Sequence, residues 1–458
     1  MKTFRAAKIC SVLFISLVSI KSIQSQNIES QIDKLISKTY IENGPGIAIL
    51  IAKNGIPLYK KSFGKSNIEL NSNVNTESVF QIGSLTKQFT ATAILMLEEK
   101  GKLKLTDNIT KYLPDYPTNG NNITIHNLLN HTSGIRGRTP ISDSKLMAID
   151  MKVEQLIEYI KKQPLKFNSG EQFSYSNSGY ILLGRIIEIV TGNSYEEFIE
   201  NYIFKKVKMN DSKYGNNKEI IKNRASGYQF NGKDYINATY MSMTLPYASG
   251  SILSTVDDLL KWQNALNSGM LIKQSNFMKA TNGSVLNNGQ KIPYGYGWYK
   301  RKINNSTAIA HGGTTSGFMS NSIYLKKENV YIIALTNCYC KKNKDIQKIT
   351  YEIASLFTQN TSETDIEKVQ LSNNELRKWI GTYRLANNTS ISIELINNNL
   401  YGYSTKKENI KHKLIPLSKN DFIFENKKFS FYFTISREGE KQVKMSSGNR
   451  TLLGVQTK

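Results

Sequence analysis

Histidine is scarce in this sequence, and one common catalytic motif is missing. Only four histidines occur in 458 residues, at His126, His131, His311 and His412. They lack the spacing of metal ligands, which disfavours metal-dependent chemistry. Gly-x-Ser-x-Gly does not occur either, and its absence disfavours a hydrolase of the lipase type. We therefore expect neither a metal site nor a cofactor.

Cysteine is equally scarce, with three residues in the chain. Cys10 falls in an N-terminal apolar run, which leaves Cys338 and Cys340 at the end of an expected strand. Extended residues two apart lie too far from each other for an unstrained bridge. Two thiols without neighbouring histidines also make a poor metal site. We predict that the chain has no disulfide framework.

Acidic residues are few: 36 Asp and Glu stand against 60 Lys and Arg, giving a formal net charge of +24. A basic excess of this size is found in proteins that bind nucleic acids. Here the excess is mostly scattered lysine without an aromatic-interleaved stripe. We therefore expect a basic, solvated surface that favours acidic cell-envelope polymers, and no nucleic-acid partner.

Long hydrophobic runs are absent after the first 25 residues. Lys2, Arg5 and Lys8 precede a 12-residue apolar run, Ile9–Ile20, which is too short to span a bilayer comfortably. This is the pattern of an export signal, with cleavage expected near Ser25; the alternative is an uncleaved membrane anchor. We predict a periplasmic or extracellular protein, not stably inserted in a membrane, and cleavage lowers the net charge to +20.

Hydrophobic periodicity predicts one sheet built from both ends of residues 26–357. Two β-rich runs, Gly46–Ala52 and Ile56–Ser62, flank Asn-Gly, a strong hairpin signal. Leu85–Lys100 is apolar nearly all round, as in a buried helix. Residues 105–290 are mostly helical, and strands return before a last helix. This predicts an α/β (α+β sandwich) fold: an antiparallel sheet flanked by helices, with an inserted helical lobe.

The C-terminal residues have a different period. Residues 358–370 are polar and are predicted to form a linker. From residue 371 to residue 458, apolar residues alternate with polar ones between turn signals such as Asn397–Asn399 and Glu438–Glu440. Period two with regular turns predicts a separate, small, all-β domain, either a barrel or a sandwich.

Three short motifs carry the candidate chemistry. In chain order they are Ser84-Leu85-Thr86-Lys87, Tyr175-Ser176-Asn177 and His311-Gly312-Gly313. Together they supply a nucleophile, two proton carriers, an amide and a glycine-lined strand, which is the set that acyl transfer through a serine ester needs. Ser-x-x-Lys also occurs at Ser62, Ser142 and Ser404. The order and context of the motifs therefore carry the inference.

Ser84 and Lys87 lie one helical turn apart on the same face. Because the helix is predicted to be buried, Lys87 is forced inside beside Ser84, where desolvation lowers the pKa of a lysine. A neutral amine next to a hydroxyl is a working general base. The helix N-terminus also favours negative charge on the serine oxygen. The competing interpretation is a serine that only caps the helix.

The second motif lies in a polar loop ahead of a helix expected to start near Tyr180. Tyr175 is a candidate proton relay, and Asn177 a candidate donor to the substrate. The alternative is an N-capping loop with a packed tyrosine.

The third motif ends an expected strand. Gly313 suggests a close approach to the backbone, and the N–H groups of Thr314 and Ser84 could form an oxyanion hole worth ~3 kcal/mol per donor. His311 either contacts the substrate or packs beside the glycines.

These motifs and their surroundings resemble the serine β-lactamase and penicillin-binding protein superfamily, on its class C branch. The resemblance covers about residues 30–357 and includes His126–Gly134, Tyr175–Gly192, Gly250–Leu259 and Tyr294–Trp298. It implies Ser84 as nucleophile, Lys87 as its base, Tyr175 as second proton carrier and Asn177 as a substrate-positioning amide. The His311–Gly313 strand is implied as the pocket wall. The C-terminal region resembles the lipocalin-like domain of some family members, though more loosely.

One departure bears on the substrate. β-Lactamases of this kind have Lys-Thr-Gly where this chain has His-Gly-Gly, so a cation and a hydroxyl are replaced. A neutral histidine loses a charge-assisted contact worth roughly 1.5–3 kcal/mol, which disfavours efficient β-lactam hydrolysis. Members with histidine here resemble D-amino-acid peptidases, amidases and esterases.

We predict an exported serine hydrolase that acts through an acyl-enzyme on a small-molecule or peptide substrate, such as a cell-wall-derived fragment. The alternative is a binding protein that acylates once and stays blocked. The sequence leaves the oligomeric state open.

Overall fold

The computed structural model describes residues 28–340, 345–358, 369, 371–406, 408–425, 429–436, 438–447 and 450–457. The predicted signal segment, residues 1–25, lies outside the described residues, as does most of the predicted linker, residues 358–370. The chain divides into two compact units. The first unit extends to Phe357 but does not include Lys302–Asn305. Those residues belong to the second unit, together with Thr358–Lys458.

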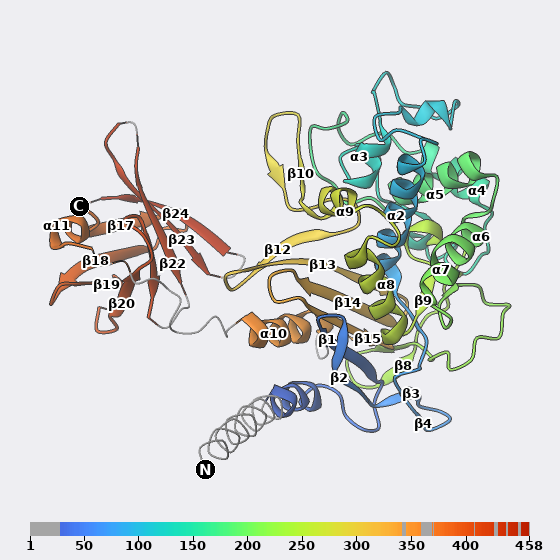
Figure 1. Ribbon diagram of the computed structural model, residues 1–458, viewed down its shortest axis with the longest axis horizontal. Helices are drawn as coiled ribbons and strands as arrows, with labels where there is room; N and C mark the ends of the chain where they lie inside the picture. Colours follow the sequence, from blue (N-terminus) through green and yellow to red (C-terminus); the bar gives the residue numbers. More distant parts are fainter. Residues whose placement is uncertain are drawn as a thin grey trace, which may run out of the picture. The chain divides into compact units, whose positions relative to one another are not determined.

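The first unit is built on a six-stranded sheet in the order β12-β13-β14-β15-β1-β2. Its strands are β1 (Ile47–Lys53), β2 (Ile56–Phe63), β12 (Tyr299–Ile303), β13 (Ser306–Thr315), β14 (Phe318–Leu325) and β15 (Val330–Thr336). β1 pairs antiparallel with β15, with Ile47 opposite Thr336. Strands from both ends of the unit therefore meet side by side in one sheet (Figure 1), which confirms the predicted fold class.

The β1–β2 hairpin has the expected turn. Asn54 and Gly55 both have positive φ angles, 54° and 77°, as a two-residue hairpin turn that matches strand twist requires. β1 is buried from Ile47 to Ala52, so both faces of the strand are covered. This is why its sequence is a continuous apolar run rather than an alternating one.

Helices cover the sheet on both faces. Adjacent residues of a strand point to opposite faces of the sheet, as Ser320 and Asn321 of β14 show. The Ser320 hydroxyl donates to the Ile82 carbonyl (2.7 Å), which precedes α2 in the chain. The Asn321 amide donates to Thr350 (2.6 Å) on α10 (Ile346–Thr358). α2 (Thr86–Glu99) is buried from Thr86 to Leu97, as its apolar composition predicts. The sheet thus lies between α2 and α10 (Figure 1).

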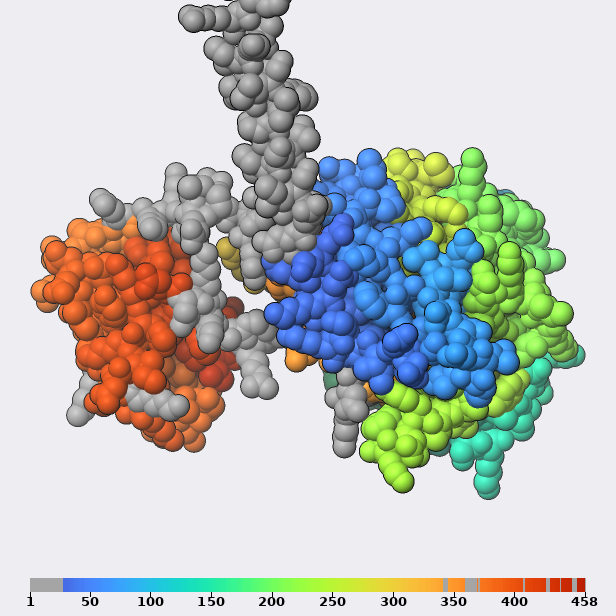
Figure 2. Space-filling model, turned by 90° about the horizontal axis from the view of Figure 1, so that it is seen from below, coloured from blue at the N-terminus to red at the C-terminus, as the bar shows by residue number. Residues whose placement is uncertain are grey.

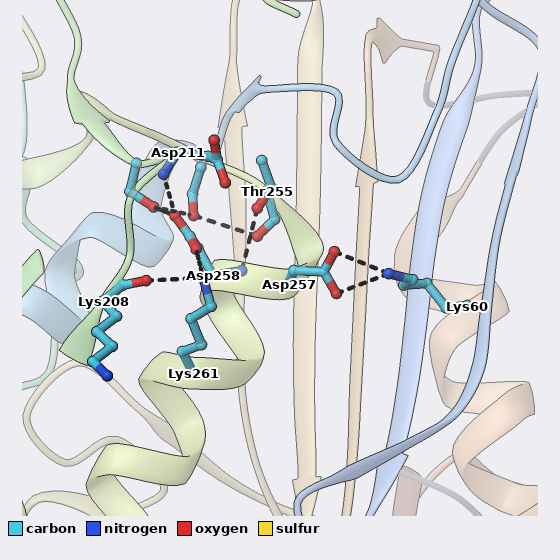
Figure 3. A network of polar contacts seen from close by, with 9 residues as sticks. Lys60, Lys208, Asp211, Thr255, Asp257, Asp258 and Lys261 are labelled. Carbon is cyan, nitrogen blue, oxygen red and sulfur yellow. Dashed lines mark hydrogen bonds and ion pairs between the residues drawn. The ribbon is translucent and has the colours of Figure 1, made fainter.

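α8 (Val256–Ser268) is fixed at its N-terminus by a buried carboxylate (Figure 3). Asp258 is fully buried and accepts from the Asp211 N–H (2.9 Å), the Ser212 hydroxyl (2.8 Å) and the Lys261 ammonium (2.7 Å). One residue earlier, Asp257 pairs with Lys60 of β2 at 3.1 Å. The helix is thereby tied both to the inserted lobe and to the sheet. Its Trp262 then stacks on Phe89 of α2, with ring centroids 3.9 Å apart.

The inserted lobe is helical, as predicted, and it also contains short strands that were not predicted. Its elements are α3 (Ile125–Leu129), α4 (Val153–Lys161), α5 (Asn177–Thr191), α6 (Tyr195–Ile199), α7 (Lys205–Val207), α9 (Gln274–Thr281), β7 (Tyr228–Phe230), β8 (Tyr235–Asn237) and β9 (Ile252–Ser254). Glu69 accepts from Tyr228 (2.5 Å) and Asn237 (2.8 Å). These contacts hold the β7–β8 hairpin against the early part of the chain, and Figure 2 shows the two segments adjoining on one face of the unit.

The second unit is a closed eight-stranded barrel. Its strands are β17 (Gly381–Leu385), β18 (Ser390–Ile396), β19 (Asn399–Ser404), β20 (His412–Pro416), β21 (Asp421–Phe424), β22 (Ser430–Ile435), β23 (Lys441–Ser447) and β24 (Arg450–Gln456), with α11 (Asn373–Arg377) before them. Successive strands pair antiparallel, and β17 closes on β24. Trp379, Phe422 and Phe433 are at most 1% exposed inside it. The predicted all-β domain is therefore a side-chain-filled barrel.

The prediction for the two cysteines is wrong. Cys338 and Cys340 form a disulfide, with Cα atoms 5.3 Å apart, inside the range that a bridge spans. The error has a structural cause: β16 covers only Cys338–Tyr339, so the chain leaves the extended conformation before Cys340.

Two negative findings apply only to the residues described above. None of their helices is long and apolar enough to cross a bilayer. They also contain no group of three metal-ligating side chains.

Candidate active site

Ser84 lies in a tight turn that the sheet forces against β13. The turn is a short 3-10 helix, Gly83–Leu85, leading directly into α2. Gly83 has φ +54°, and a Cβ atom there would lie 2.6 Å from the backbone nitrogen of Thr314. Only glycine combines this φ with so close an approach. The Ile82 N–H donates to the Ile252 carbonyl of β9 (3.0 Å), which fixes the entry to the turn.

Lys87 is buried beside Ser84 without a carboxylate. Its Nζ lies 3.1 Å from the Ser84 Oγ and donates to Asn177 Oδ1 and to the Ser249 carbonyl, each at 2.8 Å. Burial lowers the pKa of Lys87 well below its usual value. A neutral amine has two protons and one lone pair. The two oxygen acceptors take the protons, and the lone pair is left facing the serine hydroxyl.

Tyr175 completes this cluster from the other side. Its phenol is hydrogen-bonded to Ser84, and burial raises its pKa in spite of that bond. Its ring centroid lies 4.9 Å from the Lys87 Nζ. At neutral pH the phenol therefore keeps its proton and can act as a donor. The two groups that contact Ser84 have pKa values displaced in opposite directions, which is the pattern of an acid–base pair.

His131 holds the Tyr175 loop in place, a role that the sequence did not reveal. Its Nδ1 accepts from the Ser176 N–H (3.1 Å), and its carbonyl accepts from the Ser174 N–H (3.0 Å). Its ring centroid lies 4.3 Å from that of Tyr175. Burial lowers the pKa of His131 well below 6.5, so the ring is neutral and its proton sits on Nε2. The only sequence signal was its place in the family-like stretch His126–Gly134.

Asn177 is the first residue of α5, three residues earlier than the predicted helix start. The helix begins here because the Ser176 hydroxyl accepts from the Gly179 N–H (3.1 Å) and caps it. Since Asn177 Oδ1 accepts from Lys87, its amide nitrogen is left for a ligand. Ser176 therefore caps the helix, and the role of Asn177 as a donor to the substrate stays a prediction.

The third motif lies inside β13, which continues to Thr315 rather than ending at the glycines. A Cβ atom on Gly313 would lie 1.9 Å from the Ile82 carbonyl oxygen, so glycine is required for the strand to pack on the Ser84 turn. This contact places the Thr314 main chain next to Gly83 and Ser84. It is the position at which the sequence predicted an oxyanion hole.

His311 is neutral and structurally fixed. Its Nδ1 donates to the Gly312 carbonyl (2.6 Å), and its Nε2 accepts from the Tyr294 hydroxyl (3.1 Å). Burial lowers the pKa of His311 to about 3. The side chain therefore supplies no cation where the β-lactamase motif has lysine.

Two cavities meet at Ser84 and Thr314. The first, about 380 Å³, is lined by Tyr175, His311, Gly313, Tyr299 and Arg301 among others. The second, about 360 Å³, is lined by Asn177, Ile141, Met147, Met241 and Pro246 among others. Ser84 thus stands between a polar cavity and a more apolar one. A substrate can extend to both sides of the scissile bond.

Arg301 is the cation of the first cavity, and sequence reasoning missed it. The residue is half-buried, and its guanidinium carbon lies 4.2 Å above the centroid of the Tyr299 ring. It is hydrogen-bonded to Tyr351, and no described carboxylate pairs with it. Its position in β12, ten residues before His311, gave no local signal of a shared cavity.

The fold and this arrangement are those of a β-lactamase-type serine hydrolase. The family model described as Beta-lactamase matches residues 32–351, and the chain belongs to this family. It is similar to penicillin-binding protein 4* of Bacillus subtilis (strain 168), at 28% identity over 423 residues, covering 86% of this chain and 91% of that protein.

Two solved structures share the fold. The octameric penicillin-binding protein homologue from Pyrococcus abyssi matches with a TM-score of 0.64 and 24% identity, over 93% of this chain and 99% of that one. The D-amino acid amidase from Ochrobactrum anthropi SV3, complexed with L-phenylalanine amide, matches with a TM-score of 0.63 and 20% identity. That match covers 74% of this chain and the whole of the amidase.

Proposed function

We propose that this protein is an exported hydrolase that cleaves an ester, amide or D-amino-acid peptide through an acyl-enzyme on Ser84. One observation supports this above all: a fully buried lysine touches the serine and has only neutral partners. A buried amine without a counter-ion is costly, and general-base catalysis gives it a reason to be there. Relatives that are penicillin-binding proteins support the same assignment.

Acylation starts with proton transfer from the Ser84 hydroxyl to the Lys87 amine. The serine oxygen attacks the substrate carbonyl carbon, and the carbonyl oxygen becomes an oxyanion held by the N–H groups of Ser84 and Thr314. The tetrahedral intermediate collapses as Tyr175 donates its proton to the leaving oxygen or nitrogen. The Tyr175 phenolate then takes up the proton held by Lys87, which restores both groups for the next step.

Deacylation reverses these roles. Water enters the position vacated by the leaving group and gives a proton to the Lys87–Tyr175 pair as it attacks the ester carbonyl. The bond between the acyl carbon and the Ser84 oxygen breaks, and that oxygen regains its proton. The free acid leaves, so the net reaction consumes one water and restores the site.

The substrate is proposed to carry a carboxylate in the first cavity. His311 is neutral, so Arg301 is the group that can pair with such a charge there. Arginine binds carboxylates through two parallel hydrogen bonds. Asn177 and the methionine-lined cavity would hold an uncharged part of the substrate. A D-amino acid amidase among the structural neighbours is consistent with a D-amino-acid unit.

One substrate panel tests the proposal. It contains nitrophenyl esters, D-alanyl peptides, D-amino acid amides and a chromogenic cephalosporin, each assayed with the wild type and with Ser84→Ala. We expect sustained turnover of at least one ester or D-amino-acid substrate, weak cephalosporin hydrolysis, and loss of turnover in the variant. Activity unchanged by Ser84→Ala would refute the site. A single stoichiometric burst would instead favour the binding-protein alternative.

A further inference from the structure

A third cavity is also lined by Tyr175. It measures about 530 Å³, and its lining includes Arg136, Arg138, Lys162, Lys166 and Tyr175 but no aspartate or glutamate. Tyr175 therefore borders both this space, which we term the cationic cavity, and the cavity that contains Ser84. An occupant of the cationic cavity would be adjacent to the reacting groups.

The segment that carries the two arginines is locked against the second motif. A Cβ atom on Gly137 would lie 2.7 Å from the Tyr175 carbonyl oxygen and 3.0 Å from the Ser176 Cα. The Ser178 hydroxyl on α5 donates to the Arg138 carbonyl (3.2 Å). Residues 136–138 thus pack directly on the backbone that positions Tyr175.

Two hydrogen bonds, one from a main-chain N–H and one from a side-chain amide, hold the lining residues that follow α4. The Lys166 N–H donates to the Gly134 carbonyl (2.8 Å), and the Gln163 amide donates to the Arg138 carbonyl (2.9 Å). These bonds tie residues 163–166 to residues 134–138, so the cavity is a fixed element of the fold rather than a gap between independent loops.

The positive charges in the cavity are oriented but not neutralised. The Arg136 Nε donates to the Pro164 carbonyl (3.0 Å), and the Lys166 Nζ donates to the Ser174 hydroxyl (2.9 Å). These acceptors carry no net charge. Among the described residues, no ion pair involves any of the four cations. Like charges gathered in a concave site attract anions strongly.

We infer that the cationic cavity is a subsite for an anionic segment of the substrate, one that carries phosphate or carboxylate groups next to the bond that is cleaved. The substrate role rests on the proposed function, whereas the anion site itself does not. Arg136, Arg138 and Lys166 supply the main contacts, and Tyr175 marks the junction with the reaction centre.

The first experiment measures binding without turnover. In a Ser84→Ala background, tripolyphosphate, triglutamate and neutral trialanine are titrated by calorimetry at fixed ionic strength. We expect one or both anions to bind and trialanine not to bind, and the stronger anion identifies phosphate or carboxylate as the preferred group. The triple variant R136Q/R138Q/K166Q should weaken anion binding at least tenfold.

Two further variants control for diffuse charge and for folding. K53Q/K102Q/K104Q removes the same charge from exposed lysines that do not line the cavity, and should change affinity less than twofold. Lys162→Gln alters an exposed side chain that lines the cavity, and should weaken binding severalfold even if the triple variant misfolds. Equal weakening in the cavity and control variants would overturn the inference. Loss of binding in Arg301→Gln alone would overturn it too, because the probe would then occupy the catalytic cavity.

The second experiment tests the substrate role. D-Alanyl substrates with a triglutamate or trialanine extension, attached on the acyl side in one series and on the leaving-group side in the other, are compared. In one series the anionic extension should raise kcat/KM about tenfold through KM, and the triple variant should abolish the gain. A gain that persists in the triple variant, or none in either series, overturns the subsite. Anion binding without hydrolysis of any substrate would sink the proposed function but leave the anion site intact.

Discussion

The two units of this protein bury different kinds of side chain. The first encloses Lys87, His131 and His311, each at most 3% exposed. In the described residues from 371 to 457 of the second unit, every buried side chain is hydrophobic. The barrel core is dominated by aromatic rings such as Phe422 and Phe433, whose centroids lie 5.6 Å apart. The barrel core is therefore apolar and aromatic, whereas the first unit also encloses lysine and histidine side chains.

This difference shows which side chains lower the stability of the folded protein. Burying an ionisable group costs free energy unless it is neutral or paired, and Lys87, His131 and His311 all have lowered pKa values for that reason. All three lie around Ser84 and Tyr175. Substitutions in the two units should consequently change different measured quantities.

The largest effect is expected from Lys87→Met. Loss of the general base should lower kcat/KM by ~10²–10⁴-fold, while the free energy of unfolding changes by no more than about 1–3 kcal/mol, because two buried acceptors lose their donor. Lys100→Met, an exposed residue that follows the same helix, is the control and should leave both quantities unchanged. Retention of activity in Lys87→Met would remove the basis of the mechanism. Ester hydrolysis and urea unfolding give the two measurements.

Phe433→Ala should show the opposite pattern. Removing a fully buried ring from the barrel core should lower its stability by about 3–5 kcal/mol. Hydrolysis by the first unit is expected to be unchanged. Tyr432→Ala, on the exposed face of the same strand, is the matched control and should cost far less. Calorimetric unfolding would detect a separate barrel transition, and a coincident loss of catalysis would show that the units are coupled.

Acid should destabilise the first unit selectively. The folded-state pKa of His311 is about 3, below the value of about 6.5 in an unfolded chain. The unfolded state therefore binds more protons, and the free energy of unfolding falls as the pH drops from 6.5 towards 3. Since one pKa unit corresponds to ~1.4 kcal/mol, the loss is on the order of a few kcal/mol. His311→Asn should reduce this dependence, and the part that remains is expected from His131, whose pKa burial also lowers; thermal unfolding across the pH range would measure both.

The smallest effect concerns specificity. Arg301→Gln should raise KM for a carboxylate-bearing substrate about ten- to a hundredfold, because a charge-assisted contact worth roughly 1.5–3 kcal/mol is lost. The KM for a neutral nitrophenyl ester should change less than threefold, and kcat for both should change little. Steady-state kinetics on the two substrates decide the point, and an equal change for both would show that Arg301 does not recognise the carboxylate.

Short-range sequence patterns correctly predicted the elements of the fold that depend on neighbouring residues alone. Asn54-Gly55 predicted the hairpin, the apolar run after Ser84 predicted a buried helix, and period two predicted the barrel. The structure also brings Ser84, Lys87, Tyr175 and Asn177 together, as the three motifs required. Their catalytic roles remain predictions, to be tested as described above.

What the sequence did not reveal depends on contacts between distant residues. Arg301 shares a cavity with Ser84 only because β12 lies beside β13, and His131 supports Tyr175 across an inserted lobe. The cationic cavity needs residues 134–138 and 163–166 to meet. Even the wrong prediction for Cys340 came from assuming that a strand continues, which is a question of tertiary structure.

The pairing of β1 with β15 affects the order in which the parts of the site form during synthesis of the chain. A ribosome delivers Ile47 early and its partner Thr336 only when nearly all of this unit has been synthesised, and such long-range pairing is slow to form. Ser84, the proposed nucleophile, is thus synthesised long before β13, the strand proposed to hold the oxyanion. Any product truncated ahead of β13 would carry Ser84 and Lys87 yet lack a pocket, so hydrolytic competence arrives with the last strands.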